Sequence, residues 1–254
     1  MNHLDFASRA KNEFGIEGIE YVNQFFKDKA KDQSYLDEMK KRADDLGVRS
    51  VLIMCDGEGE MGDLDTKKRL KAVENHYKWI EAAKFLGCHS IRVNAAGEGD
   101  PAEVAKAAAE SLTKLATFGQ EHNIGVIVEN HGGNSSNGKW LSGIMKTVNM
   151  PNCGTLPDLG NFCIKRSKTG CEEEYDRYQG VTELIPFSPG VHDHPYDFDE
   201  NGNETTIDFN RILQIVKSAG FTGFMGIEYE GERLSEEEGI RKTKELLLRV
   251  GPLV

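Results

Sequence analysis

Four residues that could hold a metal ion or move a proton recur along this chain of 254 residues. They are Glu129, Asp158, His192 and Glu228. The clearest context is GVIVE at 125–129, where a run of β-branched residues ends on a carboxylate. Carboxylates and imidazoles bind divalent cations, and they are also the usual acids and bases of enzymes. Because the four residues are roughly 30 to 36 positions apart, a repeating fold must bring them together.

The segments around these residues alternate between predicted strands and predicted helices. The helices carry apolar residues at helical spacing, and Asp100 before Pro101 marks the start of one of them. Ser34 and Thr206 are the predicted caps of two others. The charged stretch 165–179 is predicted to be a loop plus a helix. The predicted strands are 16–23, 48–55, 89–94, 125–129, 152–158, 187–193 and 223–229.

This β/α repeat has no domain-sized break, so we predict one domain over residues 1–254, an α/β fold of the TIM-type parallel barrel class. No GxGxxG follows the first strand and no GxxxxGK[ST] occurs, so the sequence lacks the signature motifs of a nucleotide-binding sheet. Seven strands are counted where such a barrel has eight, and the first strand is the one that is missing. Three explanations stay open: a late chain start, closure with seven strands, or a gap covered by the N-terminal segment or by a second copy in a homo-oligomer.

The composition argues against several kinds of binding partner and site. A formal charge of −11 makes binding to nucleic acid or to an anionic membrane surface unfavourable. No segment reads as a signal peptide or a membrane span, so a cytoplasmic location is expected for the chain as written. The five cysteines include no CxxC pair, so they predict neither a disulfide framework nor a zinc knuckle, and most are expected to be small buried residues.

In a parallel barrel the C-terminal ends of all strands meet at one mouth, so Glu129, Asp158, His192 and Glu228 are predicted to converge. Three carboxylates and one imidazole form an oxygen-rich site, which favours one Mn²⁺ or Mg²⁺ and tolerates Co²⁺ or Zn²⁺. Without a cation the carboxylates would repel one another. Each residue also has an ordinary alternative, such as Asp158 capping the turn formed by the Leu-Gly-Asn that follows it.

The chemistry of such a site is proton abstraction next to a carbonyl. It needs a base at the carbon and an electrophile on the oxygen, which a divalent ion provides. We assign Glu129 and Glu228 as the catalytic base and acid on opposite faces of the substrate, with Asp158 and His192 as anchoring metal ligands. Candidate substrate contacts are Asn94, His131, Asn161 and His194.

A family resemblance rests on four segments, ENHGG, PDLGNF, VHDHPYDFDENGNET and GFMGIEYEG, in this order and spacing. The chain resembles the sugar phosphate isomerase/epimerase group of xylose isomerase-like TIM barrels. The resemblance implies that Glu129, Asp158, His192 and Glu228 match the single-metal ligands of ketose epimerases such as tagatose and psicose 3-epimerases. Two positions depart from the pattern: Asn161 stands where those epimerases usually have a histidine, and His194 where many relatives have a lysine.

The function expected from this is a metal-dependent isomerase or epimerase acting on a small sugar or sugar phosphate. Three alternatives stay open. An inosose dehydratase-like lyase would begin with the same proton abstraction. An endonuclease IV-like phosphodiesterase shares the barrel but needs three zinc ions and therefore many more histidines at strand ends, where this chain has Cys55, Asn94 and Asn161. A sugar-binding barrel that has lost catalysis would keep the metal without turnover.

Overall fold

The computed structural model describes residues 2–253, and its contacts divide the chain into two compact units. Unit 1 comprises Met1–Glu129 and Ile144–Gly154, whereas unit 2 comprises Asn130–Gly143 and Thr155–Val254. Among the described residues no strand precedes β1, because the chain begins with the short 3₁₀ helix η1 (His3–Asp5) and helix α1 (Phe6–Phe14).

Unit 1 is built on parallel strands, β1 (Gly18–Val22), β2 (Arg49–Met54), β3 (Ser90–Val93) and β4 (Gly125–Glu129). Strand β5 (Cys153–Leu156) follows in the same sheet and is divided by the boundary between the units. Leu52, Ile91 and Val126 are fully buried, as expected for parallel strands with near-continuous apolar runs. The C-terminal ends of β1 to β4 all point to one edge of the sheet.

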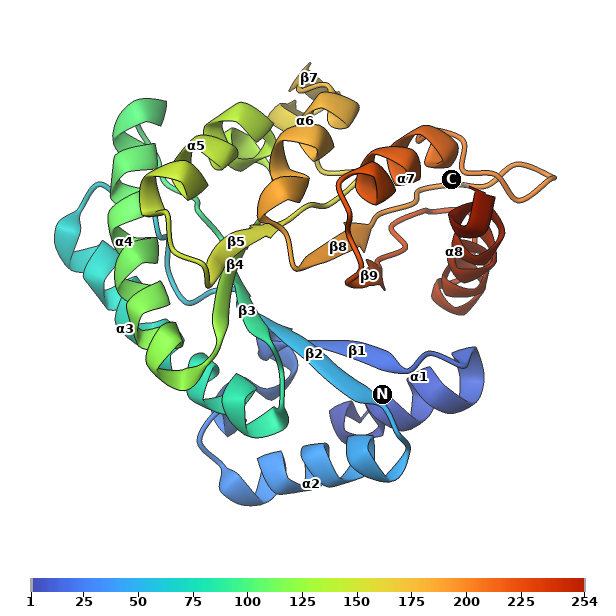
Figure 1. Ribbon diagram of the computed structural model, residues 1–254, viewed down its shortest axis with the longest axis horizontal. Helices are drawn as coiled ribbons and strands as arrows, with labels where there is room; N and C mark the ends of the chain where they lie inside the picture. The colour runs from blue at the N-terminus through green and yellow to red at the C-terminus, as the bar shows by residue number, and fades with distance from the viewer. Residues whose placement is uncertain (1, 254) are drawn as a thin grey trace. The chain divides into compact units, whose positions relative to one another are not determined.

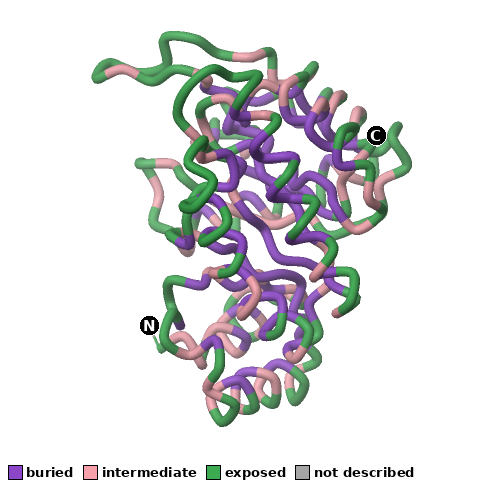
Figure 2. The backbone as a smooth tube through the Cα atoms, turned by 90° about the vertical axis from the view of Figure 1, so that its left-hand side faces the viewer, coloured by how far each residue is buried: buried purple, intermediate pink, exposed green. Residues whose placement is uncertain are grey.

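Besides α1, three helices of unit 1 lie along one face of its sheet (Figure 1), namely α2 (Gln33–Asp45), α3 (Thr66–Leu86) and α4 (Pro101–His122). Each has buried residues, among them Met39, Ile80 and Leu112, and Figure 2 shows buried and exposed stretches alternating along the helices. Asp100 caps α4 as predicted, accepting hydrogen bonds from Ala102 N and Glu103 N. The predicted cap Ser34 is wrong, because Asp32 accepts from Tyr35 N and the Ser34 hydroxyl donates to Asp32 instead.

Unit 2 contains the parallel pair β8 (Gly190–Asp193) and β9 (Phe224–Ile227). Its core is apolar and includes Phe162, Val181 and Ile212, all fully buried. Helix α7 is capped by Asp208 and not, as predicted, by Thr206, whose hydroxyl binds Glu204. Helix α5 (Gly138–Val148) begins in this unit, and the other helices are α6 (Arg177–Leu184), α7 (Phe209–Ser218) and α8 (Glu236–Val250).

All seven predicted strands are present, as β1 to β5, β8 and β9. The prediction for 165–179 was wrong in its first part. An antiparallel hairpin of β6 (Cys163–Ser167) and β7 (Gly170–Glu174) stands there, followed by α6. Every residue of β7 is exposed, so the hairpin has little apolar support of its own.

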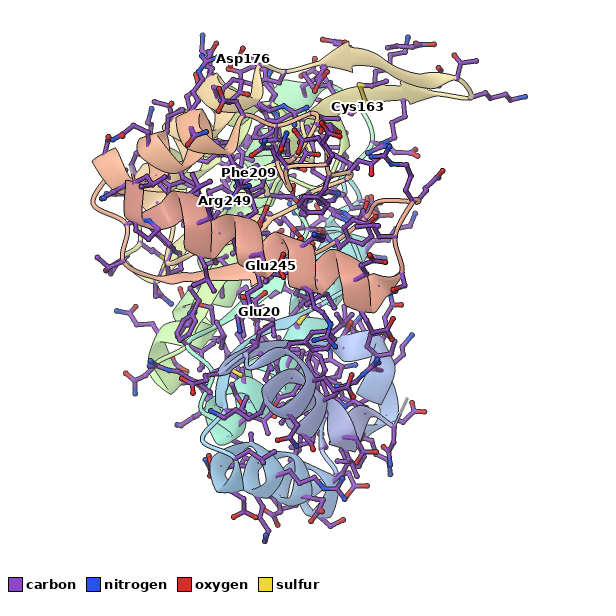
Figure 3. All side chains as sticks on the ribbon, turned by 90° about the vertical axis from the view of Figure 1, so that its right-hand side faces the viewer. Glu20, Cys163, Asp176, Phe209, Glu245 and Arg249 are labelled. Carbon is purple, nitrogen blue, oxygen red and sulfur yellow. A yellow bond between two sulfur atoms is a disulfide. The ribbon has the colours of Figure 1, made fainter. Side chains whose placement is uncertain are left out.

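A disulfide joins Cys163 to Cys171 across this hairpin, which Figure 3 shows extending from the unit. The expectation of no disulfide was therefore wrong. It rested on the absence of a cysteine motif, whereas the two cysteines meet in an irregular hairpin, in which Cys163 lies opposite Glu174, Cys171 lies opposite Arg166 and the register shifts between residues 163 and 166. Cys55, Cys88 and Cys153 are free and buried, as expected. Within residues 2–253 none of the helices is both long and apolar enough to cross a membrane.

Candidate functional site

Polar residues stand at the C-terminal ends of four neighbouring strands in unit 1. Asn23 directly follows β1, Asp56 lies just beyond β2, Asn94 follows β3, and Glu129 is the last residue of β4. Each strand ends in the same direction, so these side chains gather at one edge of the sheet. Two of the four, Asn94 and Glu129, are site residues predicted from the sequence.

Glu129 lies in a buried ion pair. Its carboxylate oxygen Oε2 is 2.9 Å from Nε of Arg92, and its side chain is 1% exposed. Arg92 Nη1 also contacts Asp56 Oδ1 at 2.6 Å, and Asn94 Nδ2 donates to that same oxygen at 2.9 Å. The predicted substrate contact Asn94 is thus bonded to Asp56. Sequence reasoning missed Arg92, although an arginine inside the otherwise uncharged buried strand SIRV was a signal.

In unit 2, Asp158 is fully buried and its carboxylate is densely hydrogen-bonded. Oδ1 accepts from the backbone N–H groups of Gly160 at 2.7 Å and Asn161 at 2.8 Å, while Oδ2 accepts from Asn161 Nδ2 at 3.0 Å. Asn130 holds the backbone of Asp158 at both its N–H and its carbonyl. Asp158 therefore caps the turn that follows it and is fixed in place. Asn161, a predicted substrate contact, bonds this carboxylate.

His192 and Glu228 lie close together at the ends of β8 and β9. His192 Nδ1 is 3.5 Å from Glu228 Oε1, with the histidine side chain fully buried and the glutamate side chain 29% exposed. An isolated parallel bridge joins His192 to Asp158. Three of the four predicted metal ligands thus come together within unit 2. Glu129 belongs to unit 1, and its role as the fourth ligand stays a prediction.

His194 joins this group, although the sequence predicted it as a substrate contact. Its Nδ1 is 2.7 Å from Asp158 Oδ2, and its Nε2 is 3.0 Å from Glu230 Oε2. Burial lowers the pKa of His194, but the hydrogen bond and charge of Asp158 and the charge of Glu230 outweigh it and raise the pKa to about 9. Without a metal ion, the proton on His194 places a positive charge between the carboxylates, and a divalent cation bound to His194 would replace it, because a metal-binding imidazole is neutral.

These donors fit a divalent cation. Asp158, His194 and Glu228 each offer one ligand atom, and the three atoms lie within 4.8 Å of one another. Oxygen and imidazole donors in this proportion suit Mn²⁺, Mg²⁺ or Zn²⁺. The set also carries more negative than positive charge, which a cation would balance.

Two further residues complete the site. His131, a predicted substrate contact, is exposed in the loop after β4, where its backbone N–H donates to Ser135 Oγ at 3.0 Å. Asp193, which sequence reasoning missed, is fully buried with neither carboxylate oxygen hydrogen-bonded among the described residues. Burial first, and then the nearby Asp158 carboxylate, raise the pKa of Asp193 well above its ordinary value.

A protein-family model and several solved structures match this chain over most of its length. The family model described as "Xylose isomerase-like TIM barrel" matches residues 9–250. A search of curated proteins found no match. Solved structures show extensive likeness: 3-keto-D-glucoside 4-epimerase from E. coli, in its apo form, is 14% identical with a TM-score of 0.75, over 98% of this chain and 94% of that one.

Two other solved structures are similar to the same degree. The IOLI protein with a binding zinc atom is 17% identical, with a TM-score of 0.77 over 98% of this chain and 93% of that one. D-psicose 3-epimerase with D-tagatose, from Clostridium cellulolyticum H10, is 12% identical, with a TM-score of 0.73 over 100% and 94%. At these identities the likeness shows the fold, and the predicted TIM-type parallel β/α class is confirmed.

Proposed function

The chain belongs to the xylose isomerase-like TIM barrel family, and we propose that it is a divalent-metal-dependent isomerase or epimerase of a small sugar or sugar phosphate. The observation that carries this proposal is the placement of Asp158, His194 and Glu228, whose ligand atoms lie within 4.8 Å of one another. Epimerases among the similar structures support a carbohydrate substrate. We also propose that residues 1–254 form a single domain, since the family model runs through both units.

The proposed metal ligands are Asp158, His192 and Glu228, with Glu129 as the fourth. His194 lies near enough to Asp158 and Glu228 to be an alternative ligand. A bound divalent ion would polarise the sugar carbonyl, which acidifies the hydrogen on the adjacent, hydroxyl-bearing carbon. Mn²⁺ or Mg²⁺ suits the carboxylate-rich set best, and a zinc atom in a similar structure keeps Zn²⁺ among the candidates.

Glu129 and Glu228 are the proposed proton-transfer residues. One carboxylate takes the proton from carbon as a general base, and the other returns a proton as a general acid. Their surroundings differ, because Glu129 is buried against Arg92 whereas Glu228 is 29% exposed. His131 and Asn94 remain candidates for contacts to substrate hydroxyl or phosphate groups. Asn161 bonds Asp158 and would act mainly by fixing that ligand.

Proton exchange at carbon tests this proposal whatever the final product. The purified chain is stripped of metal, reloaded with Mn²⁺ or Mg²⁺, and mixed in deuterated water with ketoses, aldoses, their phosphates and inososes. We expect metal-dependent incorporation of deuterium next to the carbonyl of at least one sugar, followed by nuclear magnetic resonance. The product then separates the alternatives, since an epimerase inverts the carbon, an isomerase moves the carbonyl and a lyase releases water.

Absence of exchange in every sugar, with metal bound, would contradict the proposal and favour a sugar-binding barrel. Cleavage of a phosphodiester would favour the endonuclease IV-like alternative. Exchange that is equally fast in the metal-free protein would exclude the metal-dependent mechanism while leaving the two glutamates as catalysts.

A further inference from the structure

Arg92 is a buried arginine in the centre of the unit 1 sheet. Arg92 is 4% exposed, and in the sheet it lies opposite Met54 of β2 and Ile127 of β4. A buried guanidinium is costly unless carboxylates compensate its charge, and removing a partner is more costly still. Glu129 lies two residues beyond Ile127, on the same face of β4, and therefore beside Arg92. The question is what this buried arginine does next to Glu129.

The guanidinium makes contacts in three directions. Nε lies 2.9 Å from Glu129 Oε2, Nη1 lies 2.6 Å from Asp56 Oδ1, and Nη2 donates to Met54 Sδ at 3.3 Å. Because the guanidinium is planar and its donors are fixed relative to one another, contacts on several sides fix its orientation. The position of the Glu129 carboxylate is then tied to the position of Asp56.

Asp56 is itself immobilised. Asn94 Nδ2 donates to its carboxylate at 2.9 Å, Asn23 Oδ1 accepts from its backbone N–H at 2.9 Å, and Asn23 Nδ2 donates to its carbonyl at 3.0 Å. Residues from the ends of all four strands β1 to β4 therefore form one connected polar chain that leads to Glu129. These side-chain contacts are not needed to hold the strands together, because the strands already pair through their backbones.

We propose that Arg92, held by Asp56, is a positioning residue that fixes the Glu129 carboxylate for its task in the site. The inference rests on the proposed function, in which Glu129 moves a proton and contributes to metal binding. Partners that orient a catalytic or metal-binding carboxylate typically contribute about 10-fold to 100-fold in affinity or activity. Lysine cannot replace Arg92 here, because an ammonium group is a point charge and cannot contact both carboxylates through a rigid plane.

A purely structural ion pair would look similar, and the chain offers a matched control. Arg69 in α3 is also nearly buried, with a side chain 10% exposed, and its Nη2 lies 2.9 Å from Glu110 Oε2 in α4. This pair lies in the helical layer of the same unit, and the two hydrogen-bond partners of the Arg69 side chain, Asp63 and Glu110, are not predicted site residues. Loss of Arg69 therefore reports what a buried arginine contributes to stability alone.

The experiment compares Arg92→Lys and Asp56→Asn with Arg69→Lys. For each variant, kcat, KM, the Kd for Mn²⁺ and the Tm are measured. We expect Arg92→Lys to lower kcat by about 10-fold to 100-fold with a much smaller change in KM, and to weaken Mn²⁺ binding. Asp56→Asn should lower kcat in the same direction, and the double variant should lose less than the product of the two single losses, because both act through one contact chain.

Arg69→Lys should shift the Tm by an amount comparable to Arg92→Lys and leave kcat and the Mn²⁺ Kd near the unmodified values. The inference is overturned if kcat per folded molecule and the Mn²⁺ Kd of Arg92→Lys match those of Arg69→Lys. Failure of the proposed function appears differently, as an unmodified chain that exchanges no sugar proton. Mn²⁺ affinity then decides the positioning role, since equal affinity in the Arg92 and Arg69 variants contradicts it.

Discussion

Glu129 and Glu228 are chemically identical side chains in different environments. Glu129 is 1% exposed and faces a guanidinium, whereas Glu228 is 29% exposed and faces His192. The Arg92 guanidinium compensates the charge of the buried Glu129 carboxylate, whereas solvent reaches the Glu228 carboxylate. This asymmetry suits two glutamates that act in sequence on opposite faces of one substrate.

Glu129→Gln and Glu228→Gln should each lower the rate of deuterium exchange by about 100-fold to 10,000-fold, because an amide keeps the size of the side chain but cannot accept the proton. The measurement is exchange at saturating Mn²⁺, with folding checked by circular dichroism. Glu110→Gln is the control, since this half-exposed glutamate lies in the helical layer. Near-normal exchange in either site variant with metal bound would rule out the two-glutamate mechanism.

For individual residues, the sequence predicted which side chains lie at the ends of strands but not which partners surround them. Asp158, His192, His194 and Glu228 lie together in unit 2. Arg92, Asp56 and Asp193 were not predicted as site residues. Periodicity assigns a residue to a strand, yet it does not say whether a buried charge is compensated by a partner from another strand. The contact between Asp56 and Arg92 is of that kind, because 36 residues separate them.

The turn after β5 shows how an element fixes a ligand. Gly160 lies against the His194 ring, and a Cβ at this position would come within 2.8 Å of ring atoms. Because Asp158 Oδ1 accepts from Gly160 N and Oδ2 contacts His194, the turn and the histidine share one carboxylate. Only a residue without a side chain fits between them.

Gly160→Ala should therefore displace His194 and weaken Mn²⁺ binding by about tenfold, with a loss of stability of about 1–3 kcal/mol from overpacking. Calorimetric titration with Mn²⁺ and thermal unfolding measure the two effects. Gly143→Ala in α5 is the matched control, because nothing lies within 4 Å of the Cβ it would add. That variant should bind Mn²⁺ normally, and unchanged binding in Gly160→Ala would show that the turn does not constrain the site.

The disulfide of the β6–β7 hairpin gives a prediction about thiols. Burial raises the pKa of Cys55 well above its ordinary value, raises that of Cys88 as well, and raises that of Cys153 to about 12. At pH 8 these thiols stay protonated and covered, so the native protein should react slowly with a thiol reagent.

Denaturation without reductant should expose three reactive thiols, and reduction should raise the number to the five cysteines of the chain. A Cys163→Ser, Cys171→Ser double variant should give three in both conditions. Five thiols in the unreduced denatured protein would show that Cys163 and Cys171 are not linked.

The elements were predicted unevenly for physical reasons. All seven predicted strands were found, and the signal is clearest in β2 and β4, because burial on both faces imposes a run of apolar residues there. The hairpin at 163–174 was missed since its second strand is fully exposed and carries three consecutive glutamates, which resemble a solvated loop. Two helix caps were misplaced by two residues, at Asp32 and Asp208, where neighbouring hydroxyls offered equally plausible caps.

For the whole molecule, family membership determines the fold and leaves the reaction open. The similar structures are 12% to 17% identical over nearly their full length, and two of them are epimerases that act on different sugars. The two positions at which this chain departs from the epimerase pattern, Asn161 and His194, both contact Asp158 and give this chain its own arrangement around that ligand.

The number of metal ions bound per chain is the sharpest test of a single-metal site. Equilibrium dialysis of the metal-stripped protein against Mn²⁺, followed by metal analysis, should give one ion per chain. Asp158→Ala should lose that ion while the chain remains folded, because Asp158 is a proposed ligand and its neighbours then lack its charge. No bound ion in the unmodified chain, or three ions as an endonuclease IV-like site requires, would contradict a single-metal sugar isomerase or epimerase.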